Sequence, residues 1–172
     1  MRYFSGFCFE NEQELFRDFL IKSDFCVVGF SYGAIKAFEQ VYSSKNRVDT
    51  LQLFSPAFFQ DKDEKFKRLQ LIAFKKDKQN YLKNFYQNAL YPLKTDIAKY
   101  KKDGTAEELK ELLNYKWDKE KLDIITKRGT KIEVYLGKLD KIINTEAAKE
   151  FFKSFATVYY FNRLGHIIQM NN

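Results

Sequence analysis

The chain has 172 residues and a mass of 20.5 kDa, which suits one compact domain and leaves no room for two of ordinary size. With 45% apolar and 31% charged residues it should fold as a soluble globular protein, and no apolar run approaches the ~18 residues of a membrane span. The formal charge of +7 lies in residues 62–128, which hold 18 Lys/Arg against 11 Asp/Glu. This asymmetry indicates either an acidic partner or a lysine-rich helical surface kept for solubility.

The first six residues lack the long apolar core and the small-residue cleavage site of a signal peptide. We therefore expect a cytoplasmic protein without stable membrane association. Cys8 and Cys26 lie in apolar, strand-like contexts and should be buried, reduced thiols. A single histidine excludes a histidine-rich metal site, and we expect neither a metal nor a cofactor.

Strand and helix patterns alternate in the first part of the chain. Residues 2–9 are typical of a short buried strand, interrupted by Ser5-Gly6. Asn11 and Glu14 have the spacing of a capping box and predict a helix up to about Lys22. The apolar run 25–30 predicts a strand buried on both faces. A helix over 31–42 and a strand over 48–54 complete this part.

Helical periods replace the strand patterns from about residue 61 to residue 127. Pro92 interrupts them, and Thr105 with Glu108 predicts a second capping box. Strand patterns return over 131–136 and 156–161, with a helix around 145–154 between them. The order predicts an α/β fold with a mostly parallel sheet and helices on both faces. Residues 1–61 and 128–172 would form the core, and residues 62–127 a helical lid insertion.

A Gly-x-Ser-x-Gly pentapeptide, with Ser31 at its centre, lies where the strand over 25–30 ends and a helix begins. A nucleophile elbow requires this context, because the strained serine backbone packs closely against its neighbours. The helix N-terminus also directs N–H groups toward the reacting centre. The alternative is an ordinary glycine-flanked turn between a strand and a helix.

Two further residues follow later strands at the same predicted edge of the sheet. His166, the only histidine, follows the last strand, and Asp140 follows the strand over 131–136. Parallel strands with crossover helices bring these ends together, so Ser31, His166 and Asp140 could form a catalytic triad. Glu133 and Glu146 are rival acids, although we expect Glu133 within the strand and Glu146 in the first turn of the next helix.

An oxyanion hole would need two backbone N–H donors. One should be the amide of Tyr32, directly after the nucleophile. The other should be the amide of Phe7, in the loop after the first strand, where Gly6 lets the backbone approach the site. The alternative for Ser5-Gly6 is a simple turn that ends a strand.

With these motifs the chain resembles the α/β-hydrolases, in a trimmed form. More narrowly, it resembles the short pimeloyl-[acyl-carrier protein] methyl ester esterases of bacterial biotin synthesis, the BioV type. The resemblance covers nearly the whole chain and rests on the segments 5–7, 29–33, 53–57, 137–140 and 165–166. It implies a serine esterase that removes the methyl ester from the pimeloyl chain on acyl-carrier protein. Many α/β-hydrolases begin with two further strands and have a histidine where this chain has Ser5.

The resemblance also implies an acidic partner, the acyl-carrier protein. Residues 65–83 hold seven basic side chains against one acid, and they are the candidate docking residues: Lys65, Lys67, Arg68, Lys75, Lys76, Lys78 and Lys83. Residues 94–102 are the next candidate. A generic carboxylesterase or thioesterase with the same triad is the alternative function. A catalytically dead fold that binds nucleic acid is disfavoured, because all three triad positions are filled.

Overall fold

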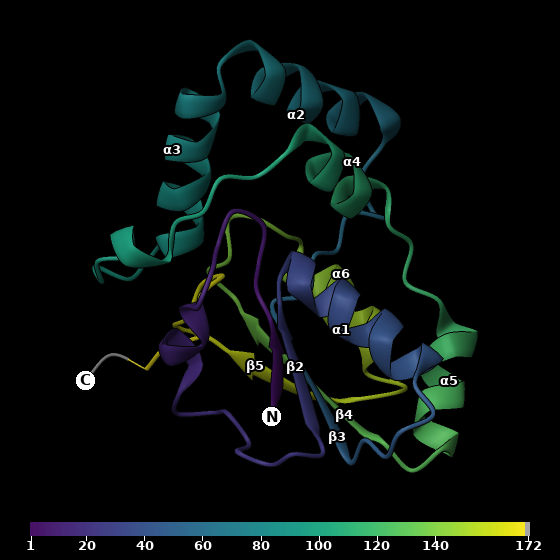
Figure 1. Ribbon diagram of the computed structural model, residues 1–172. Coiled ribbons are helices and arrows are strands. Elements are labelled where there is room, and N and C mark those ends of the chain that lie inside the picture. The colour runs from purple at the N-terminus through teal and green to yellow at the C-terminus, as the bar shows by residue number, and fades with distance from the viewer. Residues whose placement is uncertain (171–172) are drawn as a thin grey trace.

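The computed structural model describes residues 1–170, which contain a five-stranded sheet (Figure 1). Its strands are β1 (Arg2–Phe4), β2 (Cys26–Phe30), β3 (Thr50–Phe54), β4 (Lys131–Gly137) and β5 (Thr157–Phe161). They lie side by side in chain order, and every pairing is parallel. The carboxyl ends of all strands therefore meet at one edge, where the segments that follow them can form a site.

Helices cover one face of this sheet. They are α1 (Tyr32–Ser43), α5 (Lys119–Lys127) and α6 (Thr145–Phe152). The indole of Trp117 joins them, because it packs against Phe38 of α1 and Phe152 of α6. Phe38 and Phe152 are fully buried, as expected for side chains at helical spacing on a core-facing stripe.

The opposite face is covered by irregular chain and by η1, a 3-10 helix (Glu12–Phe16). Phe16 packs there against Phe30 and Phe54 of the sheet. The predicted helix from Asn11 to Lys22 is wrong: Asn11 has a φ of 54° and makes no side-chain cap. Glu12 instead turns into the protein and accepts a hydrogen bond from the Gly6 amide at 2.8 Å. The first strand is also shorter than predicted, because the chain turns after Phe4.

The predicted insertion 62–127 is helical. It contains α2 (Glu64–Lys76), α3 (Lys78–Leu90), η2 (Ala98–Tyr100), α4 (Ala106–Asn114) and α5. Figure 1 shows α2 and α3 as an arch above the sheet, with α4 beneath α2, whereas α5 lies beside α1. The capping box of Thr105 and Glu108 is present as predicted. None of the helices in residues 1–170 is long and apolar enough to cross a membrane.

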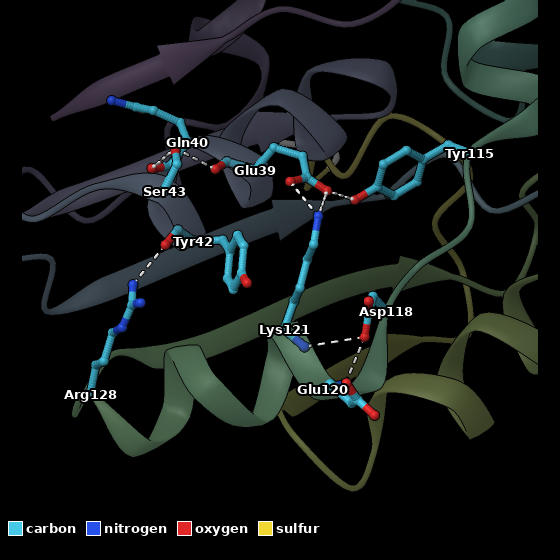
Figure 2. Close-up of polar contacts among 9 residues, drawn as sticks. All are labelled: Glu39, Gln40, Tyr42, Ser43, Tyr115, Asp118, Glu120, Lys121 and Arg128. Atoms are coloured by element: carbon cyan, nitrogen blue, oxygen red, sulfur yellow. Dashed lines mark hydrogen bonds and ion pairs between the residues drawn. The ribbon is translucent and has the colours of Figure 1, made fainter.

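A polar cluster on α1 anchors the chain where it leaves α4 (Figure 2). The Glu39 carboxylate accepts hydrogen bonds from the Tyr115 hydroxyl at 2.5 Å and from Lys121 Nζ at 2.8 Å. Burial and the neighbouring Glu39 raise the pKa of the Tyr115 phenol. Arg128, just after α5, donates to the backbone carbonyl of Tyr42 at 2.7 Å. The carboxyl-terminal part of the insertion is therefore fastened to the core.

The two cysteines are buried free thiols, as predicted. Burial, with a smaller contribution from Glu108, raises the pKa of the Cys8 thiol to about 12. Burial also raises the pKa of the Cys26 thiol to about 11. Both thiols therefore stay protonated at neutral pH and are poor nucleophiles.

Candidate active site

Ser31 lies at the turn between β2 and α1 in a strained backbone conformation, with φ 53° and ψ −115°. The turn is tightly packed on both sides. A Cβ atom on Gly29 would lie 2.4 Å from the carbonyl oxygen of Gly33, and one on Gly33 would lie 2.1 Å from that of Phe4. Only glycine fits at these two positions, and the structure around them holds Ser31 in its strained conformation. This is the local geometry that the Gly-x-Ser-x-Gly pattern predicts.

A chain of hydrogen bonds joins the three residues that the sequence singles out. His166 Nε2 lies 3.0 Å from Ser31 Oγ, and His166 Nδ1 lies 2.7 Å from Asp140 Oδ2. The side chains of His166 and Asp140 are both fully buried. Asp140 Oδ1 accepts the backbone amides of Ile142 at 2.6 Å and Ile143 at 3.1 Å, which fixes the carboxylate. The arrangement can transfer a proton from the serine hydroxyl to the imidazole.

The rival acids lie elsewhere. Glu133 is within β4, where its carboxylate accepts hydrogen bonds from Gln52 Nε2 at 3.1 Å and the Tyr135 hydroxyl at 2.7 Å. Glu146 is in the first turn of α6, and the Tyr160 hydroxyl donates to it at 2.6 Å. Asp140 is thus the acid that the structure brings to His166.

Ser55 supports the His166 loop, a role that the sequence analysis missed. Its hydroxyl donates a 2.7 Å hydrogen bond to the backbone carbonyl of His166. Ser55 is fully buried and has a φ of 41°. The sequence offered one signal, a serine between the end of a strand and Pro56, but nothing in it indicated a partner 111 residues away.

The two residues predicted to supply the oxyanion donors lie in the region of Ser31. Phe7 lines the same cavity as Ser31, and Tyr32 is the first residue of α1. Within residues 1–170, neither backbone amide donates a hydrogen bond to the protein. The first amides of a helix have no acceptor inside the helix, so the Tyr32 N–H is available to a ligand.

A buried carboxyl supports the loop that contains Phe7. Glu12 Oε1 accepts hydrogen bonds from the Gly6 amide at 2.8 Å and the Tyr3 hydroxyl at 3.2 Å. Glu12 is fully buried, and burial raises the pKa of its carboxyl. Within the described residues, its second oxygen has no hydrogen-bond partner. The sequence analysis missed this contact, because it assigned the region to the start of a regular helix.

A cavity of about 660 Å³ opens at Ser31. This volume falls within the range of small-molecule binding sites. Its apolar walls come from the core and from the insertion, with the side chains Phe7, Phe59, Phe66, Phe85, Leu109, Leu112, Leu113 and Ile142. Its polar side chains come mainly from α2 and α3. The cavity therefore has room for an extended apolar acyl chain that reaches the serine.

Helices of the insertion contact the site directly. The Tyr86 hydroxyl of α3 donates to the carbonyl of Cys8 at 2.7 Å, and the amide of Lys102 donates to the same carbonyl at 2.9 Å. The Tyr32 hydroxyl donates to Glu111 of α4 at 2.5 Å. The residue after Phe7, and the side chain of Tyr32 itself, are thus tied to the insertion.

Of the seven candidate docking residues, two are paired with acidic residues and at least partly buried, and five are exposed. Lys67 is a correction: its side chain is 7% exposed and pairs with Glu64 at 3.0 Å, so it is buried rather than on the open surface of α2. Lys78 is half-buried and pairs with Asp103 at 2.5 Å. The other five are exposed, namely Lys65, Arg68, Lys75, Lys76 and Lys83.

No protein-family model matches the chain, and no curated protein matches it in sequence. Solved structures do match its fold. An esterase from Exiguobacterium antarcticum has a TM-score of 0.63 and 18% identity, over 82% of this chain and 59% of that chain. This chain thus spans less than two thirds of that esterase.

Two shorter proteins match over more of their length. MenH from S. aureus has a TM-score of 0.61 and 14% identity, over 96% of this chain and 85% of that chain. BioG from Haemophilus influenzae has a TM-score of 0.60 and 12% identity, over 96% of this chain and 87% of that chain. With its parallel sheet and these neighbours, the chain has a trimmed α/β-hydrolase fold.

Proposed function

We propose that this protein is a serine esterase with Ser31, His166 and Asp140 as its catalytic triad. The observation that carries the proposal is the pair of hydrogen bonds from His166, 3.0 Å to Ser31 and 2.7 Å to Asp140, at the strained turn after β2. The reacting hydroxyl opens into a cavity of acyl-chain size. Esterases among the structural neighbours have the same fold, which supports this class of reaction.

The reaction would proceed through an acyl-enzyme. Ser31 Oγ attacks the ester carbonyl while His166 Nε2 accepts the hydroxyl proton. The Asp140 carboxylate holds Nδ1–H and stabilises the imidazolium. The amides of Phe7 and Tyr32 would bind the oxyanion, each contributing roughly 3 kcal/mol to transition-state stabilisation. His166 then returns the proton to the departing alcohol, and water hydrolyses the acyl-enzyme by the same steps. These steps need no cofactor.

The proposed substrate is the methyl ester of pimeloyl-acyl-carrier protein, with methanol as the leaving alcohol. Its support is the resemblance of segments 5–7, 29–33, 53–57, 137–140 and 165–166 to the short esterases of biotin synthesis. A role in biotin precursor synthesis would place the protein in the cytoplasm.

The carrier protein would dock on one exposed face of α2, which we call the α2 outer face. Its residues follow helical spacing and share one side of the helix: Lys65, Arg68, Leu69, Ile72, Lys75 and Lys76. Leu69 is 50% and Ile72 is 51% exposed, so a basic rim surrounds an apolar centre. An acidic carrier protein complements this surface in charge. Lys83, which is also exposed, lies in the next helix, α3.

A generic carboxylesterase or thioesterase with the same triad is the second candidate. The open cavity favours it, because its apolar walls would also accept acyl chains that have no carrier. The deciding experiment compares kcat/KM for the methyl ester of pimeloyl-acyl-carrier protein with that for a free short ester. We expect a strong preference for the carrier-bound substrate. Equal values would favour the generic enzyme, and Ser31→Ala is the control for background hydrolysis.

A further inference from the structure

The residue that follows α3 contacts the loop that holds His166. α3 descends from the arch toward the sheet and ends at Leu90 (Figure 1). Tyr91 comes next, and its backbone carbonyl lies directly against Gly165, the residue before His166. A Cβ atom on Gly165 would overlap the Tyr91 carbonyl oxygen. Only glycine allows this close approach, which sets the His166 loop against the end of α3.

The His166 loop packs in turn on the loop that follows β4. A Cβ atom on Gly137, the last residue of β4, would overlap the backbone carbonyls of Leu164 and Gly165. The amide of Leu139 donates a 2.9 Å hydrogen bond to the same Leu164 carbonyl. The loop that holds the acid of the triad therefore rests on the loop that holds the histidine.

The side chain of Tyr91 contacts this second loop directly. The Lys141 ammonium lies over the Tyr91 ring, 3.5 Å from the ring centroid. A cation at this distance from an aromatic face is attracted by the quadrupole of the ring. Lys141 directly follows Asp140 in the chain. One residue of the insertion thus contacts both loops, the first through its backbone and the second through its ring.

Burial in the core does not account for the Tyr91 ring. The residue is 43% exposed. Within residues 1–170 its hydroxyl makes no hydrogen bond, and its ring packs against no other aromatic ring. The contact with Lys141 is therefore the specific interaction that the structure gives to this side chain.

We propose that Tyr91 is a positioning residue for the Asp140–His166 pair. The inference rests on the proposed esterase function and adds to it a residue that acts through others. Tyr91 holds the His166 loop through its carbonyl and the Asp140 turn through Lys141. The carboxylate of Asp140 thereby keeps its 2.7 Å contact with His166 Nδ1, which orients the imidazole. A small displacement of this pair would lower the rate, because proton transfer depends on alignment.

The first test measures kcat and KM on a free short ester for two substitutions of Tyr91. Tyr91→Leu removes the ring, whereas Tyr91→Phe keeps it and loses only the hydroxyl. We expect Tyr91→Leu to lower kcat by about two- to fivefold, the equivalent of one exposed cation–π contact, with little change in KM. Tyr91→Phe should keep the wild-type kcat, because a phenylalanine ring also attracts a cation. Equal losses in the two variants would overturn the proposal.

Lys141→Met tests whether the ring acts through the lysine. If the two side chains act through one contact, the double variant of Tyr91→Leu and Lys141→Met should lose no more kcat than the more affected single variant. Losses that multiply in the double variant would overturn the proposal. Lys119→Met is the matched control, because it removes the same charge from above another ring, that of Phe151. It should keep the wild-type kcat.

The second readout observes His166 itself and needs no substrate. His166 is the only histidine, so isotope labelling of histidine gives NMR signals from one imidazole. Its ring-nitrogen shifts report where the proton lies and how strongly it is hydrogen-bonded. Tyr91→Leu should shift the Nδ1 signal, whereas Tyr91→Phe and Lys119→Met should not, and Asp140→Asn should change it most. An unchanged Nδ1 signal in Tyr91→Leu would overturn the positioning role even if kcat fell.

The two readouts distinguish failure of this proposal from failure of the proposed function. A wild-type protein that hydrolyses no ester, in which Tyr91→Leu still shifts the Nδ1 signal, would remove the esterase and leave the positioning of His166 in place. Ester hydrolysis that Tyr91→Leu does not slow, with an unchanged Nδ1 signal, would remove the positioning role and leave the esterase in place.

Discussion

The buried carboxyl of Glu12 accepts the backbone N–H of Gly6, one residue before a proposed oxyanion donor, at 2.8 Å. Burial raises the pKa of this carboxyl, so the folded protein favours its neutral form. The neutral Glu12 carboxyl thus contributes to the free energy of unfolding. This contribution is fully present below the ordinary carboxyl pKa and is lost as the pH rises through the raised pKa. The Gly6 loop thus depends on a group whose charge changes with pH.

Glu12→Gln should therefore flatten part of the pH dependence of stability. The glutamine keeps an oxygen for the Gly6 amide but cannot ionise. The gain in unfolding free energy over wild type should grow as the pH rises above the ordinary carboxyl pKa, and level off above the raised one. Denaturant unfolding at a series of pH values measures this difference. A difference that stays constant with pH would contradict the prediction. As a control, Glu12→Leu also removes the acceptor, and relative to Glu12→Gln it should cost about 1–3 kcal/mol at every pH.

Ser31→Ala and His166→Ala should each lower kcat by several orders of magnitude, because each removes a group that acts in the same proton transfer. Circular dichroism and thermal unfolding should show that both variants remain folded. A fluorophosphonate probe should label wild-type protein at Ser31 alone, as mass spectrometry of the digest would show. Labelling at Ser5 or Ser55 instead would refute the assignment of the nucleophile.

Asp140→Asn should lower kcat by about 10³- to 10⁴-fold. The amides of Ile142 and Ile143 would hold the asparagine oxygen, so its NH₂ group would face His166 Nδ1. The imidazole would then have its proton on Nε2 and could not accept one from Ser31. Glu133→Gln is the comparison, and it should reduce stability more than turnover. If Glu133→Gln were the more damaging change to kcat, Asp140 would be the wrong acid.

Much of this site follows from local sequence. Ser31 was predictable because a strained turn with glycines on both sides has a recognisable pattern. His166 and Asp140 were predictable because parallel strands end at one edge of a sheet. The contacts of Glu12, Ser55 and Tyr86 were not, because each joins residues that no periodicity relates.

The main errors of the sequence analysis have a physical cause in tertiary packing. Asn11 and Glu14 have capping-box spacing, yet burial of Glu12 at the Gly6 loop overrides this local preference. Lys67 belongs to a basic cluster in sequence, but the orientation of α2 buries its side chain inside the protein. Charge counted along a chain does not show which side of a helix faces solvent.

Tyr86→Phe should slow catalysis more than it perturbs binding. The change removes the hydrogen bond from α3 to the Cys8 carbonyl, which follows Phe7, and leaves the Lys102 amide as the remaining donor. We expect a fall in kcat of roughly two- to tenfold, from a hydrogen bond worth roughly 0.5–1.5 kcal/mol, with little change in KM. Tyr115→Phe is the matched control, because it breaks a contact of the insertion far from the Phe7 loop. Similar losses of kcat in both variants would indicate a general effect of loosening the insertion.

Reversal of charge on the α2 outer face should weaken recognition of the carrier protein. The triple variant Lys65→Glu, Arg68→Glu, Lys75→Glu spares Lys76, which also lines the cavity. Electrostatic steering by this face should raise the association rate and weaken with salt. We therefore expect the variant to raise KM for carrier-bound substrate several-fold and to flatten the dependence of KM on salt. Turnover of a free short ester should be nearly unchanged, because the triad lies outside this face.

The matched control reverses three exposed lysines at the opposite edge of the sheet, in the variant Lys22→Glu, Lys45→Glu, Lys131→Glu. It changes the net charge by the same amount, so it separates a local docking surface from the overall attraction between a basic and an acidic protein. KM for the carrier-bound substrate should rise much less than in the α2 variant. Equal effects of the two variants would mean that net charge alone drives the encounter. No effect of the α2 variant would exclude this face and move the docking surface to residues 94–102.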